Sequence, residues 1–371
     1  MNMLLTGLTG LVGASFAVDM LRNSPELRLT ALVRSSRGAK SFDRLVQAIS
    51  EQCAFDGVPA LAGSFLKRIS VVDGDLTSIP VEALETHGPF DVFFHCAADV
   101  NLGKDADGRT FETNLRGTRN ALALAKKLSI PAFHYVSTAY VAGQCSGRVM
   151  EDSLPATDFN NAYERSKFEA EKLVRASGLS FTIYRPSIVV GRRTDGAIRR
   201  PLAFYRLLEF LAKVKRHRCS KAGVPASTKI ELPLRLVAPF SDRIYFVPID
   251  YVQSSIARLF RLCPQGNGKA YHITGESPVS LKDIQVSIEN SLGAKGIVVM
   301  EKVPDPRPEE KLVMKLIGDL MPYFSSQIIF DNSNVKAALG AEALAWRVDL
   351  NFLEKISHAY FKANFPDVLS A

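Results

Sequence analysis

Cysteine is scarce in this chain, and its distribution argues against two kinds of stabilising site. The 371 residues include five cysteines, at positions 53, 96, 145, 219 and 263, and no Cys-x-x-Cys motif. An odd number of widely separated cysteines speaks against a disulfide framework and against a zinc site. We therefore expect a cytoplasmic protein with no bound metal, in which most thiols are small core residues.

Long apolar runs are missing as well. Hydrophobic residues make up 47% of the chain and charged residues 23%, which is ordinary for a soluble globular protein. No apolar run reaches the roughly 18 residues that a membrane-spanning helix needs. Because the first predicted strand begins at Met3, we also expect no signal peptide.

Acidic residues are sparse in one segment only. The net charge of the chain is +8, and residues 192–235 contain twelve Lys and Arg against three acids, so the other residues sum to −1. The densest part is Lys213, Lys215, Arg216 and Arg218, which follows the apolar run 202–211. No aromatic residues are interleaved with these bases, so we do not expect nucleic-acid binding.

A glycine-rich turn near the N-terminus predicts a phosphate-binding site. Gly7, Gly10 and Gly13 follow a short apolar strand at residues 3–5 and open a helix that extends to Arg22. Such a turn lets the backbone approach a ligand, and the helix N-terminus offers free N–H groups to a pyrophosphate. A second apolar strand about 20 residues later supports a dinucleotide-binding unit.

Strands and helices alternate through the first half of the chain, which predicts a parallel sheet covered by helices on both faces. Predicted strands lie at 29–33, 68–72, 91–95, 132–137 and 181–184, with helices at 39–52, 111–128 and 162–176. We expect an α/β doubly wound, Rossmann-like domain at 1–191 and 241–276. Residues 192–240 and 277–371 are expected to form a smaller, mostly helical substrate lobe.

The residues after the second strand bear on cofactor choice. A carboxylate there binds the ribose 2′-hydroxyl of NAD, whereas arginine accommodates the 2′-phosphate of NADP. Arg34 and Arg37 flank two serines at this point, and no carboxylate is present. The sequence therefore favours NADPH.

Tyr163 and Lys167 lie four residues apart on a predicted helix, so both face the same side. A nearby ammonium favours the phenolate, and we expect Lys167 to lower the pKa of Tyr163. A tyrosine so placed can exchange a proton with a carbonyl oxygen. Ser137 and Thr138 end the preceding strand, at the sheet edge where ligands bind. No cysteine is expected beside Thr138 or Tyr163, and His95 and His134 are expected to be packed, hydrogen-bonded histidines.

Taken together, these motifs resemble the extended short-chain dehydrogenase/reductase family. Several stretches are similar to a narrower branch, the thioester reductase domains and the fatty acyl-CoA (male-sterility) reductases. They are His95-Cys96-Ala97-Ala98-Asp99-Val100-Asn101, Asn114-Leu115-Arg116-Gly117-Thr118, Val136-Ser137-Thr138-Ala139-Tyr140-Val141, Arg185-Pro186-Ser187-Ile188-Val189-Val190-Gly191, Val247-Pro248-Ile249-Asp250-Tyr251-Val252 and Pro322-Tyr323-Phe324 with Phe330-Asp331.

The resemblance implies a role for each matching position. Thr138 would bind the carbonyl oxygen, Tyr163 would donate the proton, and Lys167 would hold the nicotinamide ribose. The other implied cofactor-binding residues are Gly7, Thr9, Gly10, Leu11, Val12 and Gly13 at the pyrophosphate, Arg34 and Arg37 at the 2′-phosphate, Asp75 and Leu76 at adenine, Ala97 and Ala98 along the cofactor, and Pro186 and Ser187 at the nicotinamide. Asn114 would support the helix beside the site.

The implied reaction is NADPH-dependent reduction of an acyl thioester to an aldehyde, with a further step to the alcohol left open. The thioester would sit on coenzyme A or on an acyl or peptidyl carrier protein. The basic cluster Lys213 to Arg218 is a candidate docking face for such an acidic partner, with peripheral membrane contact or a plain solvated surface as alternatives. Competing functions are a ketone, hydroxyl or sterol dehydrogenase, a sugar-nucleotide epimerase or dehydratase, and a non-catalytic NADP sensor.

Overall fold

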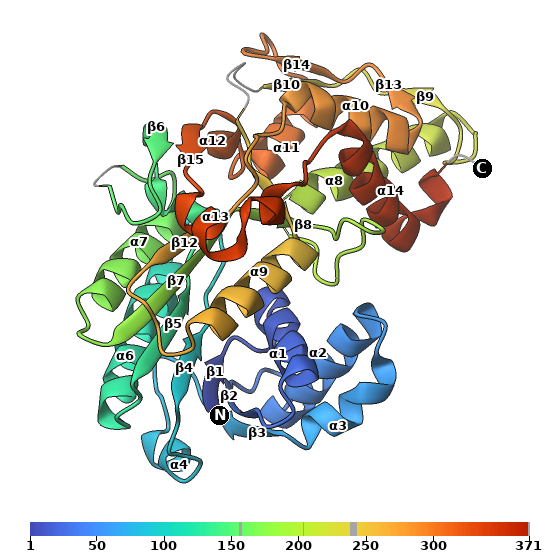
Figure 1. Cartoon of the computed structure of the whole chain (residues 1–371). Coiled ribbons are helices and arrows are strands. Elements are labelled where there is room, and N and C mark those ends of the chain that lie inside the picture. The colour runs from blue at the N-terminus through green and yellow to red at the C-terminus, as the bar shows by residue number, and fades with distance from the viewer. Residues whose placement is uncertain (156–157, 203, 238–242, 370–371) are drawn as a thin grey trace.

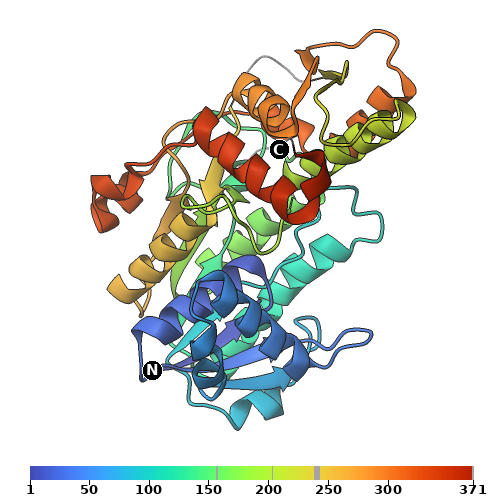
Figure 2. The same cartoon turned by 90° about the vertical axis from the view of Figure 1, so that its right-hand side faces the viewer.

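The computed structural model of the chain describes residues 1–155, 158–202, 204–237 and 243–369. Figures 1 and 2 show that the N-terminal half forms most of a sheet covered by helices. A largely helical lobe packs against one end of this sheet domain. The predicted domain boundary at 240–241 lies outside the described residues. Within the described ranges, no helix is both long and apolar enough to cross a membrane.

The strands of the first half form one parallel sheet, as predicted, and β12 from the second half joins it at one edge. Its seven strands run in the order β12-β7-β5-β4-β1-β2-β3, with every pair of neighbours parallel. The strands are β1 (Asn2–Thr6), β2 (Arg28–Val33), β3 (Ile69–Asp73), β4 (Val92–His95), β5 (Ala132–Val136), β7 (Ser180–Pro186) and β12 (Ala270–Ile273). The order reverses between β1 and β4, and ligands of such sheets bind beyond the carboxyl ends at this point.

Alternating residues of each strand enter two different cores, because successive side chains point to opposite faces. One face packs against α1 (Leu11–Asn23), α2 (Ser41–Phe55) and α9 (Ile249–Leu262). The other packs against α6 (Gly117–Lys127) and α7 (Ala162–Arg175). Phe16 of α1 stacks on Phe94 of β4 with ring centroids 3.9 Å apart, a contact of the kind worth about 1 kcal/mol beyond its burial. The doubly wound class predicted from the sequence is thus confirmed.

The predicted helix 111–128 is interrupted. A short α5 (Arg109–Phe111) leads into a π-helical turn at Glu112–Arg116, and only then does α6 begin. Single π-helical turns are rare in proteins as a whole, but those that occur often lie at functional sites. The sequence pattern could not show it, because one inserted residue leaves the apolar stripe nearly unchanged.

The second lobe surrounds a separate apolar core. Its helices are α8 (Phe204–Lys221), α10 (Leu281–Leu292), α11 (Pro308–Ile317), α12 (Met321–Phe324) and α14 (Leu350–Asn364). Short parallel pairs edge it: β10 (Arg235–Val237) with β14 (Val298–Met300), β9 (Ile230–Glu231) with β13 (Ala294–Lys295), β6 (Ser146–Val149) with β15 (Gln327–Phe330), and β8 (Ile188–Val190) with β11 (Phe246–Pro248).

Several shorter helical segments complete the described chain. α13 (Ser333–Leu339) places Val335 and Leu339 in the core shared with α9, so this late segment packs against the sheet domain. The remaining segments are α3 (Ala62–Leu66), α4 (Val81–Glu85) and 3-10 turns at Pro59–Leu61, Ala139–Ala142, Ala341–Leu344 and Pro366–Val368.

The basic cluster on α8 is not the free cationic face that the sequence suggested. Lys215 is fully buried, and its ammonium donates to the carbonyl oxygens of Leu292 and Val368. The other three bases each pair with a carboxylate: Lys213 with Glu209 at 2.6 Å, Arg216 with Asp367, and Arg218 with Glu309 at 2.7 Å. Including Lys215 in a docking face was therefore wrong, because it holds two chain segments together inside the lobe.

Replacing Lys215 with methionine is expected to lower the free energy of unfolding by about 2 kcal/mol, because two buried carbonyl groups lose their donor. Lys213→Met is the matched control on the same helix. Its surface ion pair is worth only about 0.3–0.5 kcal/mol. Urea unfolding at 25 °C measures both, and equal midpoints for the two variants would contradict a structural role for Lys215.

Candidate active site

The glycine-rich turn has no room for a side chain at Gly7 or Gly13. Gly7 has a φ of +78°, and a Cβ there would lie 2.5 Å from the amide nitrogen of Ala97 at the end of β4. At Gly13, a Cβ would lie 2.2 Å from the carbonyl oxygen of Gly7. Gly10 caps α1 without a side-chain hydrogen bond. The turn therefore presses backbone against the sheet edge and leaves the helix N-terminus open to an anion.

A cavity of about 370 Å³ lies beside this turn, across the carboxyl ends of β1, β2 and β4. It is lined by eight of the predicted cofactor-binding residues: Gly7, Thr9, Gly10, Arg34, Asp75, Leu76, Ala97 and Ala98. Leu11, Val12 and Gly13 continue into α1 behind the turn, and Arg37 stands on an exposed bend; none of these four is among the lining residues. The structure thus brings together most of the predicted set.

Three further arginines line the cavity, and the sequence analysis missed them: Arg44, Arg109 and Arg200. Burial, together with the positive charges of Arg34 and Arg200, lowers the pKa of the Arg44 guanidinium. Arg34, Arg44 and Arg200 therefore lie close together and form an anion-attracting corner at the end of β2. Arg200 comes from the basic segment 192–235, whose excess charge was visible in the sequence but whose position was not.

Two acidic residues at and after the end of β3 bind Ser35 and Arg34, which follow β2. The Asp73 carboxylate accepts hydrogen bonds from the Ser35 backbone N–H at 2.9 Å and from the Ser35 hydroxyl at 2.5 Å. Arg34 lies 3.4 Å from Asp75. Since more than half of the Arg34 side chain is exposed in this pair, it remains free to exchange Asp75 for a stronger anion such as a phosphate.

Thr138, Tyr163 and Lys167 come together from β5 and α7. The Thr138 hydroxyl lies close enough to the Tyr163 phenol to act on its pKa, whereas the Ser137 hydroxyl donates to Glu171 at 3.0 Å. The Lys167 ammonium donates to the Val136 carbonyl oxygen at 2.7 Å and lies 4.1 Å from the centre of the Tyr135 ring. A hydroxyl, a phenol and an ammonium thus share one site at the carboxyl edge of the sheet.

The pKa of Tyr163 differs from the sequence-based expectation. Burial raises the pKa of the phenol above its ordinary value, because removal from water disfavours the phenolate. Burial also lowers the pKa of the Lys167 ammonium to about 7. The expected lowering of the Tyr163 pKa by Lys167 is therefore wrong for the protein alone, in which Tyr163 is a protonated phenol.

Asn114 and Ser187 fit the implied supporting roles in different ways. Asn114 lies in the π-helical turn, exchanges hydrogen bonds with the Asp99 backbone at 2.8 and 3.0 Å, and donates to Ser166 of α7 at 2.9 Å. Pro186 ends β7, and its carbonyl oxygen accepts a bond from Thr138 at 3.4 Å. The neighbouring Ser187 hydroxyl is buried without a hydrogen-bond partner among the described residues.

The two strand histidines are structural, as expected. His95 is fully buried between the hydroxyls of Thr6 at 2.7 Å and Thr118 at 3.1 Å. His134 bonds the Tyr184 hydroxyl at 2.9 Å and the Pro264 carbonyl oxygen at 2.8 Å. Burial lowers the pKa of both imidazoles, to about 3 and about 4 respectively, so both stay neutral.

One cysteine does lie beside the site, against expectation. Cys96 lines the cavity and is close enough to Tyr163 and Lys167 to interact with both electrostatically. Burial raises the pKa of its thiol to about 12, and a neutral thiol is a poor nucleophile. Cys96 therefore lines the site as an unreactive thiol.

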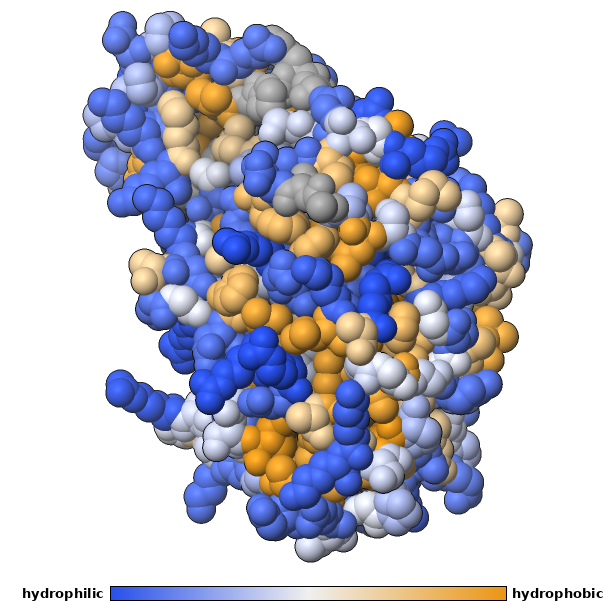
Figure 3. Space-filling model, turned by 90° about the vertical axis from the view of Figure 1, so that its left-hand side faces the viewer, coloured by the Kyte–Doolittle hydropathy of each residue, from blue (hydrophilic) through white to orange (hydrophobic). Residues whose placement is uncertain are grey.

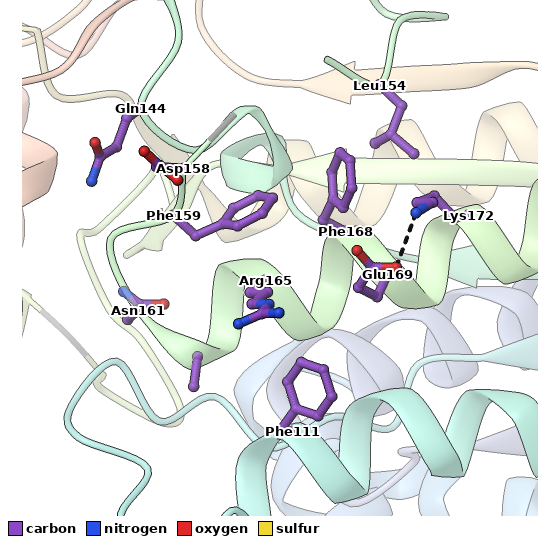
Figure 4. A pocket seen from close by; sticks show the side chains of 11 residues that line it. Phe111, Gln144, Leu154, Asp158, Phe159, Asn161, Arg165, Phe168, Glu169 and Lys172 are labelled. Atoms are coloured by element: carbon purple, nitrogen blue, oxygen red, sulfur yellow. Dashed lines mark hydrogen bonds and ion pairs between the residues drawn. The ribbon is translucent and has the colours of Figure 1, made fainter. Parts of the chain in front are cut away.

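Another hollow, of about 1140 Å³, lies along α7 and is lined by Arg165, Phe168 and Lys172 of that helix (Figure 4), but not by Tyr163 or Lys167. Charged side chains that already pair line it, such as Lys172 with Glu169 at 3.2 Å. It contains none of the predicted site residues. Figure 3 faces this side of the molecule and shows apolar patches broken up by hydrophilic residues.

Two features of the cavity beside the glycine turn fit a dinucleotide, and a third lies outside its lining. A Cβ at Gly7 would collide with the backbone after β4, so only glycine leaves the turn open, and the corner at β2 carries three guanidinium groups. The buried Ser187 hydroxyl, which does not line the cavity, lacks a hydrogen-bond partner among the described residues. These suit a pyrophosphate, a phosphorylated ribose and an amide, respectively.

Comparisons with known proteins agree with this geometry. Among curated proteins, the nonribosomal peptide synthetase FrzA of Cladobotryum sp is 27% identical over 302 residues, covering 78% of this chain and 27% of that protein. Fatty acyl-CoA reductase 1 of Gallus gallus is 26% identical over 227 residues, covering 51% of this chain and 43% of that protein. The chain thus spans less than half the length of these curated relatives.

A solved structure shows the same fold over nearly the whole chain. The terminal R domain from the myxalamid PKS-NRPS biosynthetic pathway superposes with a TM-score of 0.73 at 23% identity, covering 98% of this chain and 91% of that one. A family model described as male sterility protein matches residues 5–256, from β1 into α9. On this match, which takes in the glycine turn, Thr138, Tyr163 and Lys167, the chain belongs to the dinucleotide-binding male sterility protein family.

Proposed function

We propose that this chain is an NADPH-dependent reductase that converts an acyl thioester to an aldehyde. The observation that carries the proposal is the grouping of Thr138, Tyr163 and Lys167 near Cys96, which lines the cavity with the glycine turn and the arginine corner. The similarity to a peptide synthetase and to a fatty acyl-CoA reductase supports a thioester as the substrate.

In this mechanism Lys167 would hold the nicotinamide ribose, while Thr138 and Tyr163 act on the carbonyl oxygen of the substrate. The hydroxyls of Thr138 and Tyr163 hold the carbonyl oxygen and stabilise the negative charge that develops on it. Tyr163 then gives its proton to that oxygen, and the protonated phenol of the protein alone suits an acid. NADPH, when bound, would supply the hydride. The resulting hemithioacetal loses its C–S bond, so that the sulfur leaves with a proton as a thiol and the aldehyde remains.

Cofactor preference would come from the arginine corner, with Arg44 joining Arg34 at the 2′-phosphate. Arg44→Ala is expected to raise the KM for NADPH at least tenfold and to change the KM for NADH little, because charge-assisted bonds to a phosphate contribute about 1.5–3 kcal/mol. Arg22→Ala, at the far end of α1, removes the same charge and serves as control. Equal effects of Arg44→Ala on both cofactors would contradict 2′-phosphate recognition.

The substrate side is built on the division of the chain into lobes. We propose that residues 1–191 and 241–276 hold the cofactor and that residues 192–240 and 277–371 shape the acyl site, with α13 packed against the cofactor-binding unit. The thioester would be delivered by coenzyme A or by a carrier protein, in a cytoplasm that suits the free cysteines. With Lys215 buried, a docking face would use exposed bases of the same segment, such as Lys213 and Arg216.

A substrate panel tests the proposal. NADPH oxidation is followed with acyl-coenzyme A, acyl-carrier protein, aldehyde, ketone and sugar-nucleotide substrates. Consumption with a thioester is the expected result. Oxidation with ketones alone, or conversion of sugar nucleotides without any thioester turnover, would replace the proposal with one of the other short-chain dehydrogenase/reductase activities.

A further inference from the structure

Tyr323 belongs to the motif Pro322-Tyr323-Phe324, which has no role in the proposed mechanism. It lies on α12 in the C-terminal lobe and is only 2% exposed. Its ring meets that of Tyr140 edge-on, with centroids 4.7 Å apart. Its hydroxyl accepts a hydrogen bond from the Asn161 side-chain amide at 2.9 Å, and it lies close enough to the Glu164 carboxylate to lower the pKa of that group. One phenol from the second lobe thus reaches two side chains of the first turn of α7.

Those two side chains cap the helix that carries Tyr163. Asn161, which Figure 4 shows at the beginning of α7, is the N-cap residue, and its side-chain oxygen accepts from the Glu164 N–H at 3.0 Å. Glu164 in turn accepts from the Asn160 N–H at 2.9 Å. Such reciprocal capping fixes the start of a helix. Tyr163 lies between the two capping residues in the chain.

The Glu164 carboxylate depends on these few partners. It is fully buried, and within the described ranges no lysine or arginine forms an ion pair with it. Burial raises the pKa of this carboxyl group, whereas hydrogen bonds from Asn160 and the nearby Tyr323 hydroxyl lower it; the N-terminal end of the α7 dipole also favours the negative charge. A buried charge that loses a donor is costly, so removal of the Tyr323 hydroxyl is expected to shift the turn.

We propose that Tyr323 is a positioning residue: through Asn161 and Glu164 it fixes the first turn of α7, and with it the Tyr163 hydroxyl, against the C-terminal lobe. The inference rests on the proposed reductase function. Reacting groups must be held closely, since a misplacement of about 1 Å costs on the order of 100-fold in rate. Tyr323 therefore links the lobe assigned to the substrate with the helix that carries the proton donor.

Tyr323→Phe tests this link, because it keeps the ring on Tyr140 and removes one oxygen. We expect kcat to fall at least ~10-fold while the Kd for NADPH stays within about twofold. Tyr360→Phe is the control: Tyr360 lies in the same apolar core but contacts the rings of Tyr205, Phe361 and Phe365, none of which belongs to α7. An unchanged kcat for Tyr323→Phe, or equal losses in both variants, would overturn the proposal.

A double-mutant cycle with Glu164→Gln separates positioning from a general loss of stability. If Tyr323 acts through Glu164, the double variant is no slower than the slower single variant, whereas multiplied losses contradict the link. If Tyr323→Phe does not fold, Glu164→Gln alone carries the test: it must lower kcat without weakening NADPH binding.

Amide hydrogen exchange at residues 162–166 tests the position of the turn without any substrate. It should become faster in Tyr323→Phe and stay unchanged in Tyr360→Phe; unchanged exchange in both would overturn the proposal. A wild-type protein that reduces no thioester would refute the proposed function. The link would then be judged by exchange and by kcat on whichever carbonyl compound is reduced.

Discussion

Replacement of Tyr163 with phenylalanine is expected to lower kcat at least ~100-fold while NADPH still binds. The phenol is the acid that meets the carbonyl oxygen in the proposed mechanism, and general acid catalysis typically contributes about 100- to 10,000-fold. The ring stays in place on α7, and Tyr163 is not among the residues that line the cofactor cavity. Stopped-flow measurement of a single turnover gives the rate, and quenching of protein fluorescence gives the Kd for NADPH.

Tyr271→Phe is the matched control for this prediction. Tyr271 is also buried, and its hydroxyl also accepts a hydrogen bond, from Asn267 at 2.7 Å, but it lies on β12 at the edge of the sheet. Its kcat should stay within about twofold of wild type. A Tyr163→Phe variant that keeps most of its kcat, or that loses NADPH binding to the same degree, would remove the proton-donor role.

The second large effect is expected at the glycine turn. Gly7→Ala should weaken NADPH binding more than ~100-fold, because the added Cβ would lie 2.5 Å from the Ala97 nitrogen and 2.6 Å from the Cys96 carbonyl carbon. Real side chains do not approach backbone so closely, so β1 and α1 must move away from the end of β4. Equilibrium titration with NADPH measures the loss.

Gly7→Ala combines a steric clash with the strain of a left-handed φ, and a control variant at Gly57 separates the two effects. Gly57 also has a left-handed φ, +73°, but a Cβ there would meet nothing within 4 Å. Gly57→Ala therefore reports the strain of the backbone conformation alone, about 1 kcal/mol of stability, with NADPH affinity unchanged. If Gly7→Ala bound NADPH as well as Gly57→Ala does, the turn would not be the pyrophosphate site.

Much of the fold could be read from periodicity. Short apolar runs between helical patterns located six strands of the main sheet to within about two residues, because buried parallel strands are apolar on both faces. β12 was not among them, since residues 270–273 contain Tyr271 and His272 and lie in a region of irregular alternation. The spacing of Tyr163 and Lys167 also predicted one shared helix face, whereas the role of Thr138 was implied by the family resemblance; the catalytic assignment of all three stays a prediction.

What the sequence could not supply are contacts between distant segments. Arg44 of α2 and Arg200, which is far from it in the sequence, both line the cavity beside β2, and the charge of Arg200 lowers the pKa of the Arg44 guanidinium. Lys215 counted as a surface charge in the composition, yet its ammonium lies between carbonyl groups of α10 and the C-terminal turn. The environment of Tyr163 also depends on distant segments: burial, which no local pattern reveals, is the main cause that raises the pKa of its phenol.

The most direct test of the account is the product balance of one turnover. The protein is mixed with NADPH and a fatty acyl-coenzyme A or acyl-carrier-protein thioester, and the loss of NADPH, the free thiol and the trapped aldehyde are measured together. The account predicts one thiol released for each thioester reduced and an aldehyde as the first product. With Tyr163→Phe, the loss of NADPH and the formation of thiol and aldehyde should all be at least ~100-fold slower. NADPH oxidation by carbonyl compounds with no thiol released from any thioester would contradict it.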